Sequence, residues 1–130
     1  MVKNLSTNYS IICDWISELR DQQIQTDRLR FRRNLERIGE AAGIENNREL
    51  EYDLKEIQTP LGISPSKVLK EQPVLATILR AGLPLHQGLL NVFDKADNAF
   101  ISAYRKHRRD GTFDISLDYI SSPDIENRVV

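Results

Sequence analysis

The chain has 130 residues, the size of one ordinary domain, and 40% of them are hydrophobic while 28% are charged, which is typical of a globular protein. The formal net charge of −1 excludes a strong overall field that would attract nucleic acid or an anionic membrane. The single cysteine, Cys13, excludes an intrachain disulfide, and no apolar run is long enough to span a membrane. We therefore expect a reducing, cytoplasmic location, with neither a membrane nor a nucleic acid as partner.

Two helices are predicted at the start of the chain, over residues 8–43. Apolar residues recur at helical spacing around Trp15, and Cys13 lies within this pattern, which indicates a small core or interface residue rather than a reactive thiol. Thr26 is a candidate N-cap of the second helix, and Gly43 is a candidate stop signal at its end.

The polar face of the second predicted helix is rich in arginine. One interpretation is a solvated face on which neighbouring carboxylates balance the positive charges, and the other is an anion-binding surface. The carboxylates favour the first interpretation. The residues concerned are Asp27, Arg28, Arg30, Arg32, Arg33 and Arg37 on the face itself, with Glu36 and Glu40 close by.

A short strand-and-turn region is predicted over residues 50–72, and an α/β core over residues 73–130. Tyr52–Ile57 has the composition of a strand, and Thr59–Gly62 is a turn signal. Val74–Leu79 is a continuous apolar run bounded by breakers, which is typical of a buried strand. Pro84 suits the first turn of a helix that follows this strand.

Three further strands complete the predicted pattern. Ala99–Tyr104 is a second apolar run, and alternation of apolar and polar residues from Phe113 to Tyr119 predicts a half-exposed strand. Asn127–Val130 has the pattern of the opening of another strand, so we expect the chain to be the front portion of a single larger domain whose C-terminal part is absent. Strand, helix and strand in succession predict an α/β fold with a parallel-sheet core, preceded by the N-terminal helices.

The junction between Val74–Leu79 and the helix after it is the main candidate binding site. Arg80, Ala81 and Gly82 follow the strand directly. Backbone N–H groups at a helix start attract anions, a glycine lets the ligand approach closely, and a guanidinium suits phosphate oxygens. The pattern therefore predicts a phosphate or pyrophosphate site, and the alternative is a turn in which Arg80 reaches only solvent or a surface carboxylate.

The next apolar run ends in the same way, at Arg105. Two neighbouring parallel strands would bring Arg80 and Arg105 to one edge of the sheet, where they could hold a single polyanion. The alternative is a basic surface loop formed by Lys106, His107, Arg108 and Arg109 and closed by the turn at Asp110 and Gly111.

The remaining sequence offers no catalytic group. We interpret His107 as solvated or in contact with phosphate, and His86 as structural or exposed. No spacing of metal ligands, no pairing of a nucleophile with a base and no Walker-type loop is present in the sequence, so no catalytic residue and no metal ligand is assigned.

Several segments together resemble the uracil phosphoribosyltransferase family, a group of type I phosphoribosyltransferases. "PVLATILRAGLPLHQGLL" is similar to a segment of that family, and "ISAYRKH" places a Tyr-Arg pair with its arginine 25 residues beyond Arg80, as in the family. "DYISSPDIENRVV" and the early "RDQQIQTDRLRFRRNLERIGEAAGIE" are similar as well. The family's later loop for the ribose phosphate and its uracil-recognising segment are not in the sequence.

The resemblance implies a partial type I phosphoribosyltransferase fold and the conversion of uracil and phosphoribosyl pyrophosphate to uridine monophosphate and pyrophosphate. It implies that Arg80 and Arg105 contact phosphate groups of the donor, and that Ala81 and Gly82 lie near the departing pyrophosphate. It also implies Mg²⁺ bound with the diphosphate. Because two parts of the family's site are missing, we expect these 130 residues alone to be inactive.

Two other functions are kept as alternatives. The first is a phosphoribosyltransferase-like regulator that binds RNA through its basic clusters, although the near-zero net charge disfavours it. The second is a non-catalytic fragment that only self-associates. Because Ile12, Trp15 and Ile16 need a surface to cover them, we expect a homodimer or a higher oligomer in any case.

Overall fold

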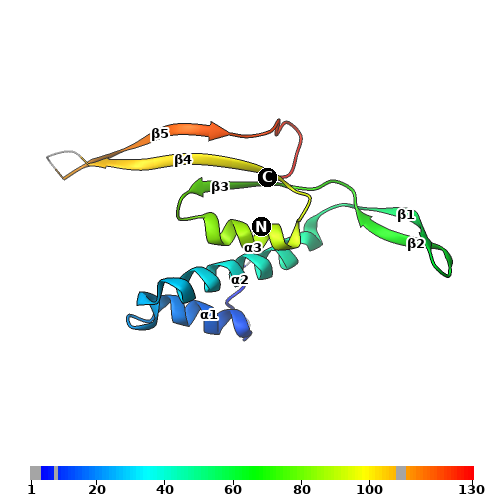
Figure 1. Cartoon of the computed structure of the whole chain (residues 1–130), viewed down its shortest axis with the longest axis horizontal. Coiled ribbons are helices and arrows are strands. Elements are labelled where there is room, and N and C mark those ends of the chain that lie inside the picture. The colour runs from blue at the N-terminus through cyan, green and yellow to red at the C-terminus, as the bar shows by residue number, and fades with distance from the viewer. Residues whose placement is uncertain (1–3, 8, 108–110) are drawn as a thin grey trace.

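The structure is a computed structural model that describes residues 4–7, 9–107 and 111–130. It confirms the predicted α/β class, with helices preceding a sheet (Figure 1). In chain order the elements are α1 (Ile11–Arg20), η1 (Ile24–Thr26), α2 (Arg28–Asn46), η2 (Asn47–Glu49), β1 (Tyr52–Thr59), β2 (Gly62–Leu69), β3 (Val74–Leu79), α3 (Leu83–Val92), β4 (Asp97–His107) and β5 (Phe113–Ser121).

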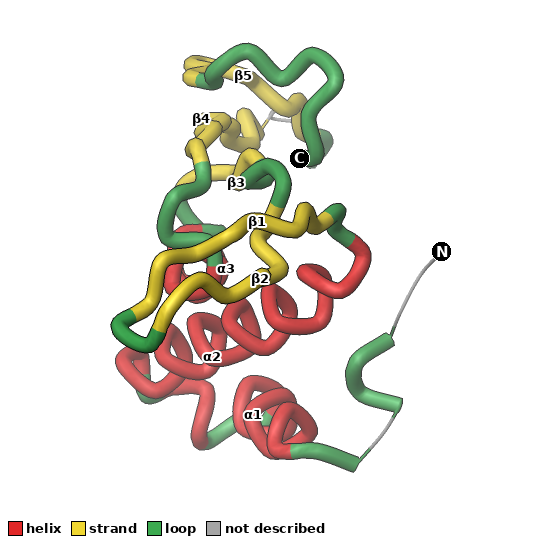
Figure 2. The backbone as a smooth tube through the Cα atoms, turned by 90° about the vertical axis from the view of Figure 1, so that its right-hand side faces the viewer, coloured by secondary structure: helices red, strands yellow, loops and turns green. Residues whose placement is uncertain are grey.

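The helices lie together on one side of the sheet. Helix α3 lies between β3 and α2, and α1 packs against α2 on the side away from α3 (Figures 1 and 2). The two-stranded hairpin of β1 and β2 projects beyond this stack (Figure 1). Among the described residues, no helix is both long and apolar enough to cross a membrane.

The main sheet is mixed rather than wholly parallel. Its order is β3-β4-β5, with β3 and β4 parallel in the register Val74 opposite Asp97 to Leu79 opposite Ser102, as predicted. Strand β5 runs antiparallel to β4. The reason is the connection, because only a few residues separate β4 from β5, whereas a parallel pair needs a crossover of a dozen or more.

A bulge changes which residues of β5 share a face. Ser102 pairs with Tyr119 and Ala103 pairs with Leu117, so Asp118 is an extra residue on β5. The predicted alternation therefore holds from Phe113 to Leu117 and then shifts, and Tyr119 turns to the other face. Strand β5 is also exposed on both faces for most of its length, rather than half-exposed.

The region 50–72 forms a regular hairpin, of which the sequence predicted only the first strand and the turn. Strands β1 and β2 pair from Tyr52 opposite Leu69 to Thr59 opposite Gly62. Gly62 has a φ of 130°, which only glycine adopts readily, so it closes the tight turn. Strand β2 tolerates Pro65 because a two-stranded ribbon leaves one edge of each strand unpaired.

Both predicted boundaries of the second helix are wrong. The N-cap of α2 is Asp27, whose carboxylate accepts hydrogen bonds from the backbone N–H groups of Leu29 and Arg30 at 3.0 Å each, and not Thr26. Helix α2 also continues past Gly43 to Asn46. Gly43 is buried inside the helix, so it serves packing and not termination.

Glycine governs the crossing of α2 and α3. A Cβ atom on Gly88 of α3 would overlap the backbone carbonyl oxygen of Glu36 and lie 2.8 Å from the backbone nitrogen of Glu40. A Cβ atom on Gly39 of α2 would overlap the carbonyl oxygen of Leu85 in the same way. The two helix backbones are therefore in direct contact, at a distance that side chains would not permit.

The core is small and lies where α3 meets the first half of β3. Leu75, Phe93 and Ala96 form its buried cluster, and Leu50 and Leu89 pack against it. The prediction that all of Val74–Leu79 is buried holds only for its first residues.

The far half of β3 is exposed on the face away from α3. Ile78 is 59% exposed, and the register places it in one row with Ile101 and Ile120. This face of the sheet has no helix over it in the described structure (Figure 2). The exposed aliphatic side chains of the sheet therefore gather on this face, whereas the exposed Tyr104 and Tyr119 lie on the other.

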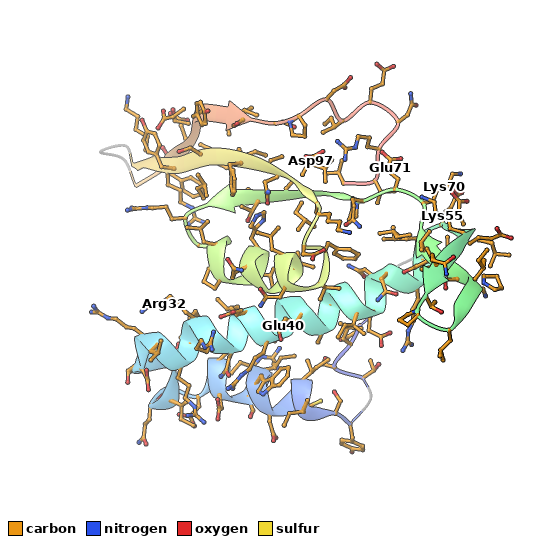
Figure 3. All side chains as sticks on the ribbon, turned by 45° about the vertical axis from the view of Figure 1, so that its right-hand side comes forward. Arg32, Glu40, Lys55, Lys70, Glu71 and Asp97 are labelled. Carbon is orange, nitrogen blue, oxygen red and sulfur yellow. The ribbon has the colours of Figure 1, made fainter. Side chains whose placement is uncertain are left out.

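The last residues return to the beginning of the sheet but do not form the predicted strand at Asn127–Val130. The backbone N–H of Val74 donates to the carbonyl of Val129 at 2.8 Å. The Arg128 guanidinium contacts Asp97 at 2.7 Å and Glu71 at 3.2 Å, and Figure 3 labels these two carboxylates beside the first residues of the sheet strands. Both contacts raise the pKa of Arg128 and tie this segment to the amino ends of β3 and β4.

Candidate functional site

The candidate anion site lies at the carboxyl end of β3. Arg80 and Ala81 are exposed and Gly82 is half-buried, and together they form the turn from β3 into α3, with Pro84 in the first turn of the helix as predicted. The peptide bond between Leu79 and Arg80 is cis. Among the described residues, the Arg80 side chain has no ion-pair or hydrogen-bond partner, so its guanidinium is available to a ligand.

Fewer backbone donors are available at this turn than the sequence suggested. The N–H of Gly82 donates to the carbonyl of Ile78 at 3.2 Å, and the N–H of Leu83 donates to the carbonyl of Arg80 at 3.2 Å. Pro84 has no N–H group to offer. Any anion at this end of α3 therefore depends more on the Arg80 side chain than on the helix terminus.

The structure gives a reason for glycine at position 82 besides the predicted approach of a ligand. Its φ is −72°, which any residue adopts, so the backbone conformation does not require glycine. A Cβ atom would instead overlap the Thr77 hydroxyl oxygen and lie 2.9 Å from the carbonyl oxygen of Ile78. Gly82 is thus needed for the close return of the chain onto β3, on the side where α3 packs.

Arg105 lies on the neighbouring strand at the same end of the sheet. Leu79 is opposite Ser102, so Arg105 is about 7 Å further along the strand direction than Arg80. Its guanidinium lies over the Phe113 ring, 4.8 Å from the ring centroid, and the side chain is exposed. The structure therefore brings Arg80 and Arg105 to the same end of two adjacent parallel strands. That both bind the same ligand stays a prediction.

The basic run after Arg105 is only partly described. Lys106 is exposed on β4, and His107 is the last residue of that strand. Arg108, Arg109 and Asp110 lie outside the described residues, as does the His107 side chain.

The arginine-rich face of α2 is partly neutralised within the chain. Arg30 binds Glu18 through two nitrogens, at 2.9 and 2.8 Å, and Arg33 contacts Glu36 at 2.7 Å. These pairs agree with the interpretation of a charge-balanced, solvated face. They leave less free positive charge for an RNA-binding role.

A polar network that the sequence did not predict joins α1 to α2. Asn34 is only 1% exposed, and its amide donates to Glu18 at 2.6 Å. The hydrogen bonds from Arg30 and Asn34 lower the pKa of Glu18 to about 2. The signal for it was an asparagine within the otherwise apolar stripe of the second helix.

His86 is buried, so the structural interpretation is correct and the exposed one is wrong. It is 5% exposed, its ring lies 5.1 Å from that of Phe100, and its Nε2 lies 2.7 Å from the side-chain oxygen of Asn98. The sequence carried no signal for this pairing, because Asn98 lies on β4 and only the parallel register brings it beneath α3.

Three comparisons with known proteins bear on this arrangement. The sequence profile of the family described as uracil phosphoribosyltransferase matches residues 6–120. A uracil phosphoribosyltransferase of Porphyromonas gingivalis is 47% identical over 129 residues, which cover 99% of this chain and 60% of that protein. The chain belongs to the uracil phosphoribosyltransferase family. The resemblance inferred from the sequence motifs is thereby confirmed.

More distant relatives show the same relation. A uracil phosphoribosyltransferase of Methanococcus maripaludis is 34% identical over 116 residues, covering 88% of this chain and 48% of that protein. The solved structure of the AQ2163 protein from Aquifex aeolicus is similar with a TM-score of 0.83 at 26% identity, covering 98% of this chain and 59% of that one. The chain thus spans about half to three fifths of the length of these relatives.

The cavity at the other end of β3 is separate from the arginines. It has a volume of about 320 Å³, and its lining includes Leu50, Leu75, Leu89, Phe93 and Val129. Because it lies beside the amino-terminal half of β3, neither Arg80 nor Arg105 lines it. In this chain of the uracil phosphoribosyltransferase family, the candidate phosphate site is therefore an open strand edge and not this apolar hollow.

The described residues do not fit a magnesium site built by the protein. They contain no group of three or more histidine, cysteine, aspartate or glutamate side chains close enough to hold a metal ion. Magnesium commonly takes most of its ligands from water and substrate phosphates. Binding of Mg²⁺ with the diphosphate stays an expectation from the family.

Proposed function

We propose that the polypeptide carrying these residues transfers a phosphoribosyl group from phosphoribosyl pyrophosphate to uracil. A bond forms between N1 of uracil and C1 of the ribose, the bond from C1 to the pyrophosphate oxygen breaks, and the N1 proton is released. The products are uridine monophosphate and pyrophosphate. Family membership and the exposed arginines at the ends of two adjacent parallel strands support this proposal.

In this proposal the chain acts by binding and orienting the leaving group. The Arg80 and Arg105 guanidinium groups bind oxygens of the diphosphate and stabilise the negative charge that grows on it as the bond to C1 lengthens. Ala81 and Gly82 set the course of the turn beside that charge. Reactions of this kind gain most of their rate from positioning and electrostatics, so no protein nucleophile is required.

The observation that carries the proposal is the unpartnered Arg80 at the end of β3. A charged side chain that the described residues leave unpaired, beside the start of a helix, is typical of a phosphate-binding position. An Arg at a strand end that merely served solubility would be replaceable without loss of ligand affinity.

The test measures binding of inorganic pyrophosphate by isothermal titration calorimetry. Arg80→Ala and Arg105→Ala should each weaken pyrophosphate binding by about 10- to 100-fold, as expected for the loss of hydrogen bonds to a charged group. The control is Arg48→Ala. Arg48 is also an exposed arginine, but it lies just after the C-terminal end of α2, where its side chain pairs with Glu45. Unchanged affinity in Arg80→Ala would refute the proposed role, and a separate assay with labelled uracil tests the reaction itself.

We also propose that these 130 residues do not complete the reaction by themselves, since the relatives that they match are longer. Unless the ribose phosphate and the uracil are held as well, most of an orientation effect worth about 7–11 kcal/mol is lost. Uridine monophosphate formation by a purified 130-residue chain, at the rate of the longer relatives, would contradict this proposal.

A further inference from the structure

His86 is a buried polar residue whose presence stability alone does not explain. It occupies the first half of α3, with Leu83, Leu85 and Leu89 within one helical turn, and it is 5% exposed. Its Nδ1 atom is buried and has no hydrogen-bond partner among the described residues. An apolar residue of similar size would avoid that cost, because a buried polar atom without a partner destabilises the fold.

The hydrogen bonds of Asn98 indicate the direction of its contact with His86. The side-chain amide of Asn98 donates to the carbonyl of Ala96 at 3.4 Å, which directs the Asn98 oxygen toward His86. Because this oxygen can only accept, the His86 Nε2 carries the hydrogen and donates it, at 2.7 Å.

Through its backbone, the same histidine holds the candidate phosphate turn. Its N–H donates to the carbonyl of Gly82 at 2.9 Å, and the N–H of Gly82 donates in turn to the carbonyl of Ile78 on β3. The residue is therefore bonded to the turn by its main chain and to β4 by its side chain. Among the described residues, no other side chain of α3 forms a hydrogen bond to the sheet.

We propose that His86 is a positioning residue that fixes the turn at Arg80–Gly82 relative to β4, the strand that carries Arg105. The hydrogen bond to Asn98 sets how far α3 lies along β4, and the bond to Gly82 passes that placement to the turn. The relevance to a diphosphate rests on the proposed function, whereas the placement of the turn does not. Asn98 is the partner through which His86 acts, since it belongs to β4 itself.

Three variants separate positioning from packing. His86→Phe keeps a ring of similar size against Phe100 and removes the donor, whereas His86→Gln keeps an N–H donor of similar reach. Asn98→Ala removes the same hydrogen bond from an exposed residue of β4, so it tests the inference even if His86→Phe does not fold.

The first readout is amide hydrogen exchange of the turn, which needs no ligand. His86→Phe and Asn98→Ala should each raise the exchange rate of the Gly82 amide about tenfold, the effect of one lost hydrogen bond, and His86→Gln should restore it to within about threefold. Amides of α1 should not change, because α1 contacts neither α3 nor β4. Unchanged exchange at Gly82 in both His86→Phe and Asn98→Ala would overturn the inference.

The second readout is the affinity for inorganic pyrophosphate, measured by calorimetry on the same variants. We expect His86→Phe to weaken it about tenfold and His86→Gln to restore it, with no loss of melting temperature in His86→Phe. If the wild-type protein binds no pyrophosphate while exchange still responds, the proposed function fails and the positioning role stands. If pyrophosphate binds wild type and His86→Phe equally, the claim that this placement serves the diphosphate is wrong, and the proposed function stands.

Discussion

The contact between the backbones of α2 and α3 predicts that one methyl group on Gly88 will destabilise the protein. In Gly88→Ala the new Cβ would overlap the Glu36 carbonyl oxygen and lie 2.8 Å from the Glu40 backbone nitrogen. Both atoms belong to the α2 backbone, so no side-chain rotation relieves the overlap. The helices must separate, and that opens the layer next to the Leu75 and Phe93 core.

The magnitude follows from two opposing contributions. Forcing an extra methyl group into a packed contact costs about 1–3 kcal/mol, and a contact with two backbone atoms belongs at the upper end of that range. Replacement of glycine by alanine in a helix returns about 1 kcal/mol through helix propensity. We therefore expect a loss of about 2 kcal/mol in the free energy of unfolding, or about 8 °C in melting temperature for a domain of this size.

The matched control is Gly43→Ala, at the same helix crossing. There the new Cβ would lie 3.1 Å from side-chain atoms of Val92, which can move by a few tenths of an ångström. Packing and helix propensity then nearly cancel, so the unfolding free energy should change by less than about 1 kcal/mol. Both are measured by thermal and urea denaturation followed by circular dichroism, and a Gly88→Ala protein as stable as Gly43→Ala would refute the backbone contact.

Three further predictions concern other parts of the chain. The Arg30 hydrogen bond is the main cause that lowers the pKa of Glu18 from 4.5 to about 2. The ionised Glu18 therefore stabilises the fold above pH 4.5, and this contribution is lost as the pH falls through about 2. Glu18→Gln should accordingly melt below wild type at pH 7, with the difference shrinking toward pH 2, and a constant difference would contradict the assignment. Gly82→Ala should lower the free energy of unfolding, and adding Thr77→Ala should recover part of that loss, as measured by a double-mutant cycle in urea. If the effects of the two substitutions on the free energy of unfolding are strictly additive, the two sites do not touch. Light scattering should give a mass of at least a dimer, and a monomer at working concentration would exclude self-association.

The grounds for expecting an oligomer differ from those seen in the sequence. The apolar face of α1, with Trp15, is half-buried because α1 packs on α2, and the Arg37 guanidinium lies 5.8 Å from the Trp15 ring centroid. Most of the strongly exposed apolar side chains lie instead on the sheet and on the hairpin, where Ile115 and Leu61 are examples, although Tyr9 before α1 and Leu29 on α2 are exposed as well.

Local patterns in the sequence were sufficient for the class of the fold and for most of its elements. Helical spacing predicted α1, the apolar runs predicted β3 and β4, and Pro84 correctly marked the first turn of α3. The candidate phosphate residues were likewise readable, because Arg80 and Arg105 each follow an apolar run. These features depend on residues within a few positions of one another, where periodicity and steric preference act directly.

Only the tertiary structure decided the roles of the residues that local patterns did not predict correctly. Gly43 has the same local signature as a helix stop, but contact with a distant helix gives it a packing role. Gly82 is required by Thr77 behind it, and the bulge at Asp118 turns Tyr119 away from the predicted face. His86 acquires its partner from the register of β3 and β4. In each case the deciding contact joins separate elements, and no periodicity within one element carries information about which atoms another element will bring against it.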